Sequence, residues 1–291
     1  LVLIEHKASP FRVLRNFAKA MEENRQKTAL ISETYQRLQR DLSELRGDVN
    51  AAREALNEAR DYQDTLDVIR RWTNDRVFQL GTRMLHGATD PEEAGAPMSD
   101  IADAGLRKLL PAVHQEFSQR HGEVPNSAFA VIGLGKLGGR EMTVESDLDL
   151  TFVYDVSGDI SNCPKPLTPE LYFTRLSQRL IGAITAPTAE GKLFDVDMRL
   201  RPSGHSGPIA TPLERFLYYQ RENAWTWEHM ALTRARVIVA DDGLEHRIQS
   251  AIRDVLTRER DGSRLVSDVA DMRDRIAREH QSDDPWAIKH Y

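Results

Sequence analysis

The sequence predicts an α+β fold, in which a central part with strands and helices is flanked by helical segments at the N-terminal and C-terminal ends. Three observations predict it. Residues 12–85 lack proline and carry apolar residues at steps of three and four, which is typical of helices. Three short apolar segments in the middle of the chain have the length and pattern of strands. Residues 244–280 return to a helical pattern.

Composition limits the class of protein. The chain has 291 residues, 40% of them hydrophobic and 29% charged, with a net charge of −6. These values indicate a soluble globular protein of about two domains, and the acidic balance argues against a nucleic-acid partner. The single cysteine, Cys163, excludes an intramolecular disulfide and favours a reducing compartment, so a cytoplasmic location is expected.

The ends of the chain and its hydropathy carry two further expectations. No apolar run approaches the ~20 residues that span a bilayer, and no signal peptide is visible, so no membrane partner is expected. The chain starts at Leu1 rather than at a methionine and stops at Tyr291 without a tail. We therefore expect a fragment of a longer protein.

Residues 1–90 are expected to form a helical scaffold, either a helical hairpin or a small bundle. Apolar steps such as Leu38, Leu42 and Leu45 support this prediction, and the many charges between them are expected on a solvated face. Residues 87–97 are rich in proline, glycine and alanine, which predicts a linker.

Residues 91–241 are predicted to form the central domain. Its first helix is expected to be capped by Ser99 or Asp100. The strand at 148–154 is expected to turn its leucine and aromatic side chains to the core, opposite the two aspartates described below. The other elements expected up to residue 184 are the end of the first helix at 121–122, a strand at 128–132 and a helix at 167–184.

A third strand is predicted at residues 193–200 by a strict alternation of apolar and charged residues. Its apolar face has a phenylalanine, a valine, a methionine and a leucine. Its polar face has two acids followed by two arginines, a set that suits a cluster of cations and phosphates. The four polar residues are Asp195, Asp197, Arg199 and Arg201.

The remaining elements follow from turn and cap signals. Residues 202–207 predict a turn, and Thr211 with Pro212 and Glu214 predicts a helix start with a capping box. A strand is expected at 237–240. Residues 242–291 are expected to be the beginning of a C-terminal helical domain that is truncated here.

The most informative segment joins a glycine-rich turn at residues 133–139 to a strand that carries Asp147 and Asp149. Strand side chains alternate between faces, so these two aspartates point the same way. Two carboxylates that close repel each other unless a proton or a cation lies between them. A divalent metal that holds the phosphates of a nucleotide is the simplest reason for this arrangement.

Nucleotidyl transfer needs about three carboxylates on a rigid platform, which two metal ions use to bind the triphosphate. Asp147 and Asp149 supply a pair and Asp197 a third, and oxygen ligands of this kind suit Mg²⁺, with two ions expected. Glycines allow the turn to approach phosphate closely. The residues expected to contact phosphate are Gly135, Lys136, Gly138, Gly139, Arg199 and Arg201.

The sequence can be compared with several other kinds of site. An Asp-x-Asp pair alone is common on surfaces, and the turn fits neither the dinucleotide fingerprint, whose helix is doubtful here, nor a Walker loop. A zinc site and a serine-hydrolase motif are both absent from the pattern. Asp195 is expected to contact the metal-binding acids without binding the metal itself, although it could instead be a surface residue. At least one of Trp225 and Trp227 is expected in the core, and Glu228 and His229 could support the site.

The segment Gly133-Leu-Gly-Lys-Leu-Gly-Gly-Arg-Glu141, followed by Ser146-Asp147-Leu-Asp149, resembles the glutamate-ammonia-ligase adenylyltransferases, members of the DNA polymerase β-like nucleotidyltransferase superfamily. Two further blocks resemble the same family. They are Val196-Asp-Met-Arg-Leu-Arg-Pro-Ser-Gly204 and Ala224-Trp-Thr-Trp-Glu-His229, the second continuing through Arg234-Ala-Arg236, and the match extends over about residues 61–291.

The resemblance implies a mixed sheet, ATP as a substrate and Mg²⁺ as a cofactor. It implies that Asp147, Asp149 and Asp197 are the catalytic metal ligands and that Asp197 also helps to deprotonate the attacking hydroxyl. Gly135 and Lys136 take the place of a phosphate-contacting Gly-Ser pair of the wider superfamily, and Ser146 belongs to the nucleotide-binding set.

Proteins of this family carry two catalytic halves. One transfers AMP from ATP to a tyrosine hydroxyl of glutamine synthetase, and the other removes that AMP by phosphorolysis. The tryptophan block is more similar to the adenylylating, C-terminal half. The deadenylylating activity, a non-catalytic nucleotide- or partner-sensing module and a polynucleotide polymerase are the alternatives. The PII signalling protein and glutamine are implied as regulators, without residues that identify their sites.

Overall fold

The computed structural model describes residues 61–157 and 160–279, together with Lys19, Leu56 and Ala59. The described elements all belong to one unit of the chain that begins at Ala59. The helices predicted before residue 61 therefore lie outside the described residues. Within the described part, no helix has both the length and the apolar character needed to cross a membrane.

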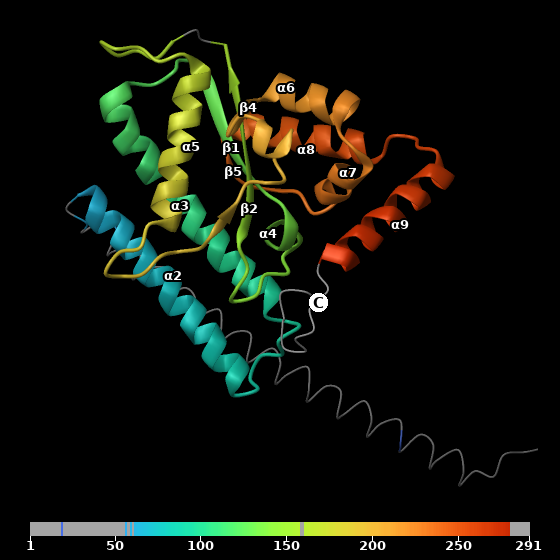
Figure 1. Cartoon of the computed structure of the whole chain (residues 1–291). Coiled ribbons are helices and arrows are strands. Elements are labelled where there is room, and N and C mark those ends of the chain that lie inside the picture. Colours follow the sequence, from blue (N-terminus) through green and yellow to red (C-terminus); the bar gives the residue numbers. More distant parts are fainter. Residues whose placement is uncertain (1–18, 20–55, 57–58, 60, 158–159, 280–291) are drawn as a thin grey trace, which may run out of the picture. The chain divides into compact units, whose positions relative to one another are not determined.

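The described part is a mixed α+β structure, as the sequence predicts (Figure 1). Its sheet has five strands, with the order β3-β2-β1-β5 and with β4 beside β2. β2 is antiparallel to β1, which is antiparallel to β5, whereas β3 and β4 both run parallel to β2. The strands are β1 (Ser127–Gly133), β2 (Leu148–Val156), β3 (Val196–Asp197), β4 (Ala210–Pro212) and β5 (Arg236–Ala240).

Helices cover both faces of the sheet (Figure 1). On one face, Phe129 and Tyr154 of the sheet stack on Phe173 of α5 (Pro169–Thr185). On the other face, apolar residues of the sheet form one buried cluster with α6 (Leu213–Tyr218), α7 (Thr226–Leu232) and α8 (Asp242–Leu256). Because both faces are covered, Thr151 and Val153 of β2 are as buried as the residues predicted to face the core.

Two long helices precede the sheet, α2 (Tyr62–Leu85) and α3 (Gly95–His121). α3 ends as predicted, with Gly122 in a left-handed conformation. It begins four residues before the predicted cap, because Pro97 fits in the first turn, where its missing N–H needs no partner. Ser99 is buried within the helix, and its hydroxyl donates to the carbonyl of Gly95 at 2.8 Å, so neither Ser99 nor Asp100 is the cap.

The third strand is much shorter than predicted, with only Val196 and Asp197 in the sheet. The chain turns immediately after it. The Asp197 carboxylate accepts from the backbone N–H of Arg199 at 2.8 Å, which is a typical aspartate-stabilised turn. The buried Arg201 side chain then donates to the carbonyl of Met198 at 2.7 Å. The alternation of apolar and charged residues continues through this turn, so a prediction from that pattern overestimates the length of the strand.

Two further boundaries differ from the prediction. Thr211 and Pro212 pair with β2 as part of β4, so α6 starts at Leu213, one residue after the predicted start, with Pro212 rather than Thr211 at its N-cap position. The C-terminal helical segment is divided into α8 and α9 (Gly262–Glu279). The division lies where the Asp261 carboxylate accepts from the backbone N–H groups of Ser263 and Arg264.

Candidate functional site

Three acids predicted from two parts of the sequence lie close enough in the structure for two of them to affect the ionisation of the third. Asp149 and Asp197 are direct partners in the parallel pairing of β2 with β3, so they lie side by side on one face of the sheet. Asp147 precedes β2 by one residue. Burial, followed by the negative charges of Asp197 and Asp147, raises the pKa of Asp149 to about 6, although Arg199 and Lys136 act in the opposite direction.

The glycine-rich turn lies directly against Asp149. β1 ends at Gly133, and the next residue, Leu134, donates its backbone N–H to the carbonyl of Asp149 at 2.9 Å. Gly135 has a φ of 51°, and a Cβ at this position would lie 2.0 Å from Oδ2 of Asp149. Only glycine allows the backbone to come this close to the carboxylate.

Most of the glycine-rich turn forms a helix that is only five residues long. This is α4 (Gly135–Gly139), at the place where the sequence left a helix in doubt. Leu137 is fully buried and anchors it. A Cβ at Gly138 would lie 1.8 Å from the carbonyl oxygen of Arg234, so this glycine allows α4 to pack directly on the backbone before β5, whereas Gly139 has ordinary space.

Two other predicted phosphate ligands lie beside the acids. Lys136 is half-buried in α4, where its charge acts on Asp149. Ser146 closes the turn before Asp147, since its hydroxyl accepts from the backbone N–H of Thr143 at 2.9 Å. Their contact with phosphate stays a prediction.

The two arginines of the predicted polar strand face have different surroundings. Arg199 is exposed, and its Nε donates to Oδ2 of Asp197 at 2.7 Å, which raises the pKa of this arginine. Arg201 is buried within its own loop, with its guanidinium directed to main-chain carbonyls. Asp195 does not support the acids as predicted, because its carboxylate is exposed and forms an ion pair with Lys192 at 2.7 Å.

The tryptophan block has no buried tryptophan. Trp225 is 70% exposed and Trp227 37% exposed, so the prediction that at least one packs in the core is wrong. Glu228 is the buried member of this block. It accepts from the Trp225 backbone N–H at 2.9 Å and from the Tyr219 hydroxyl at 2.7 Å, and thereby fixes the start of α7.

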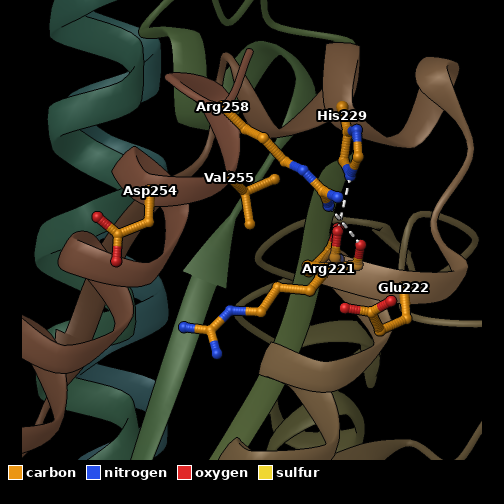
Figure 2. A pocket seen from close by; sticks show the side chains of 7 residues that line it. Arg221, Glu222, His229, Asp254, Val255 and Arg258 are labelled. Atoms are coloured by element: carbon orange, nitrogen blue, oxygen red, sulfur yellow. Dashed lines mark hydrogen bonds between the residues drawn. The ribbon is translucent and has the colours of Figure 1, made fainter. Parts of the chain in front are cut away.

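A cavity of about 230 Å³ lies between α8 and η2 (Tyr219–Asn223), a π-helical turn (Figure 2). The wide turn leaves carbonyls to be paired from outside. His229 hydrogen-bonds to the carbonyl of Gln220 at 2.9 Å, and Arg258 donates to the carbonyl of Arg221 at 2.8 Å. His229 therefore stabilises this turn rather than the acid site.

One interaction at the site was not predicted from the sequence. Arg236, the first residue of β5, pairs through both terminal nitrogens with the carboxylate of Asp103 in α3. The same guanidinium donates to the carbonyls of Leu137 and Gly138 in α4. The only sequence signal was the position of Asp103, an acid among the buried residues of α3.

The three acids have the negative charge needed to bind a cation. A carboxylate whose pKa is raised by burial and by two neighbouring carboxylates is stabilised in its charged form when a cation is bound. Among the described residues, however, no three acidic, histidine or cysteine side chains are already gathered closely enough to hold a metal ion. Asp197 is directed to Arg199 instead, so metal binding would require Arg199 to turn away.

Comparisons with known proteins identify the family of the chain. The family model for glutamate-ammonia ligase adenylyltransferase matches residues 13–251. The chain is similar to bifunctional glutamine synthetase adenylyltransferase/adenylyl-removing enzymes. It is 46% identical over 236 residues to that of Mesorhizobium japonicum and 48% identical over 236 residues to that of Brucella suis, in each case over 80% of this chain and 24% of the relative. The chain thus spans about a quarter of the length of these relatives. It belongs to the glutamate-ammonia ligase adenylyltransferase family.

Proposed function

We propose that this chain is an adenylylating catalytic unit, which transfers AMP from ATP to a tyrosine hydroxyl of glutamine synthetase. The observation that carries the proposal is the group of three acids beside a glycine turn that fits against one of them. The relatives are bifunctional enzymes of glutamine synthetase, which indicates the protein substrate and allows both directions of the reaction. The tryptophan block and the Leu-Arg-Pro-Ser-Gly segment favour the adenylylating direction.

Asp147, Asp149 and Asp197 would hold two Mg²⁺ ions. The cation would supply positive charge to the triphosphate and to the leaving pyrophosphate. Asp149 is suited to this role because a positive charge offsets the repulsion from its two neighbours.

The chain's own residues would bind and orient the nucleotide. The backbone at Gly135 can approach a phosphate closely, and Lys136 adds a positive charge beside Asp149. Arg199 is 71% exposed, so its guanidinium can turn from Asp197 toward a phosphate with little loss of packing. That movement would also release an oxygen of Asp197.

The reaction forms a bond between the tyrosine oxygen and the α-phosphorus of ATP. The bond between the α-phosphorus and the oxygen that bridges to the β-phosphate breaks, and pyrophosphate leaves. We assign the tyrosine proton to the carboxylate of Asp197, the acid at the start of the exposed turn. A general base in this position contributes typically about 10²–10⁴-fold to the rate.

The test is transfer of label from α-labelled ATP to glutamine synthetase in the presence of Mg²⁺. The wild-type chain should label its substrate, and Asp147→Asn, Asp149→Asn and Asp197→Asn should each lose most of that activity. Asp195→Asn is the matched control, because Asp195 lies in the same segment but pairs with Lys192 on the surface. Equal labelling by the control and by the three variants would contradict the assignment.

The reverse activity is the second candidate, because the relatives carry both activities in one name. It uses the same acids, so the structure does not separate the two. Incubating adenylylated glutamine synthetase with the chain and inorganic phosphate would produce ADP if this chain removes AMP. A non-catalytic sensing module would bind ATP in a calorimeter without a dependence on Mg²⁺.

The expected regulators can be tested in the same assay. The PII signalling protein and glutamine are proposed from the resemblance alone. Each would be added to the labelling reaction of the wild-type chain. A rate that responds to neither would contradict this part of the proposal.

A further inference from the structure

The glycine turn has little stability of its own. α4 is five residues long, whereas isolated helices shorter than about 12–15 residues are marginal in water. It must nevertheless be placed accurately, because the backbone at Gly135 lies against Oδ2 of Asp149 with no room for even a methyl group. Something outside the turn has to fix its position.

Arg236 makes contacts that can do this. Its Nη2 donates to the carbonyl of Leu137 at 2.9 Å, and its Nε lies 3.4 Å from the carbonyl of Gly138. Both carbonyls are at the C-terminal end of α4, where helix carbonyls commonly need partners from outside the helix, and that of Leu137 also accepts from the backbone N–H of Arg140 at 3.3 Å. A cation at this end is also favoured by the helix dipole.

Asp103 in turn fixes Arg236. The carboxylate pairs with both Nη1 and Nη2 of the guanidinium, and the Nη2–Oδ1 distance is 3.1 Å. Asp103 is 8% exposed and belongs to a helix that packs on other elements of the fold. A carboxylate this buried is costly unless it is paired. The pair therefore joins α3, β5 and α4, which are far apart in the sequence.

We propose that Arg236 and Asp103 are positioning residues, which hold the glycine turn against Asp149 and thereby set the geometry of the acid site. Neither residue is among the three acids or in the segment that carries them. The inference rests on the proposed function for its effect on AMP transfer, but its effect on the turn itself does not depend on that function.

The chain offers a matched control one turn earlier on α3. Asp100 pairs with Arg140, the residue that follows α4, at 2.8 Å, and both side chains are largely exposed. This second ion pair also joins α3 to the end of the glycine turn, but in the described structure neither of its side chains hydrogen-bonds to a carbonyl of α4. Asp100→Asn should therefore remove an ion pair of similar location without moving the turn.

The experiment compares Asp103→Asn and Arg236→Lys with Asp100→Asn in two measurements. The first is hydrogen exchange of the backbone N–H groups of Gly138 and Glu141, which donate within the turn at 2.8 Å. Lysine keeps the charge of Arg236 but cannot form its fork of contacts. We expect exchange at these positions to become at least tenfold faster in both test variants and to stay unchanged in Asp100→Asn.

The second measurement is the Mg²⁺ concentration that gives half-maximal AMP transfer. Loss of residues that support metal ligands typically costs about 10–100-fold, so we expect an increase of at least tenfold in both test variants. A general loss of stability would lower activity without changing this concentration. Since Arg236→Lys is conservative, it keeps the test valid if Asp103→Asn does not fold.

The outcomes separate the two proposals. Folded test variants with wild-type exchange in the turn, or with wild-type Mg²⁺ dependence in an active chain, would overturn the positioning role. A wild-type chain that neither transfers nor removes AMP would contradict the proposed function. In that case the exchange measurement decides the positioning role alone, because it requires no activity.

Discussion

Replacing Asp149 by asparagine is expected to make the protein more stable at neutral pH while removing its activity. The pKa of Asp149 is raised from 3.8 to about 6 by burial and by the charges of Asp197 and Asp147. The folded state therefore binds a proton at this carboxylate more tightly than the unfolded state does. Stability from this proton is fully present below about pH 3.8 and is lost as the pH rises through about 6.

The size of the effect follows from the shift. A pKa difference of about 2 units corresponds to about 3 kcal/mol. Because the carboxylate is only half-buried, solvent screening reduces this, and we expect about 1–2 kcal/mol at pH 7.5. Asparagine has nearly the same shape and carries no charge, so Asp149→Asn should recover this free energy above pH 7 and differ little from wild type at pH 4.

The assay is urea unfolding followed by tryptophan fluorescence between pH 4 and pH 8, with AMP transfer measured in parallel. Asp149→Asn should be the more stable protein at pH 7.5 and should lose about 100-fold or more in activity, the effect typical of losing one transition-state group. Asp195→Asn should differ from wild type by less than about 0.5 kcal/mol at every pH. A variant that is less stable than wild type at pH 7.5, or a difference that does not vary with pH, would refute the reasoning.

Two further substitutions test the same site. Gly135→Ala should cost about 2 kcal/mol or more and abolish transfer, because alanine is strained at a positive φ and its Cβ would collide with Asp149. Thermal unfolding against Gly182→Ala, whose Cβ meets open space in a helix, checks this, and the control should be stabilised by about 0.5–1 kcal/mol. Arg199→Ala should change stability by less than about 1 kcal/mol, because its pair with Asp197 is exposed. It should raise the KM for ATP about tenfold, measured by steady-state kinetics; an unchanged KM would remove Arg199 from the phosphate contacts.

Much of the fold follows from local sequence patterns. Strands β1 and β2 were predicted within two residues of their observed ends, because apolar runs and alternation report directly on burial. The end of α3 was predicted from a glycine that takes a left-handed conformation there. Local rules failed where two of them apply to the same residues. Thr211 and Pro212 were predicted as the cap and first residue of a helix, but both pair with β2 in a strand, so α6 starts one residue later, with Pro212 at its N-cap position.

The acid site was predicted in part for the same reason. Alternation placed Asp149 and Asp197 on polar strand faces, but it did not specify that β3 runs parallel to β2 with these two residues as partners. Nor did it show that β3 ends at Asp197, since the turn depends on a hydrogen bond from a backbone N–H to a side chain. The exposure of Trp225 and Trp227 also depends on tertiary packing, because their spacing alone is compatible with a core position.

The features that local rules do not explain lie close together. Gly135 adopts a positive φ, Asp149 is a half-buried carboxylate with two acidic neighbours, and Arg236 is joined to a buried aspartate instead of water. The charged groups, Asp149 and the pair of Asp103 with Arg236, cost free energy that uncharged residues would not, and Gly135 makes a close approach that any other residue would make only with strain. Natural proteins accept such costs mainly where function requires them. Substitutions that relieve the cost at Asp149 should therefore increase stability and reduce activity together, whereas substitutions in the buried cluster under α6 and α8 should reduce both.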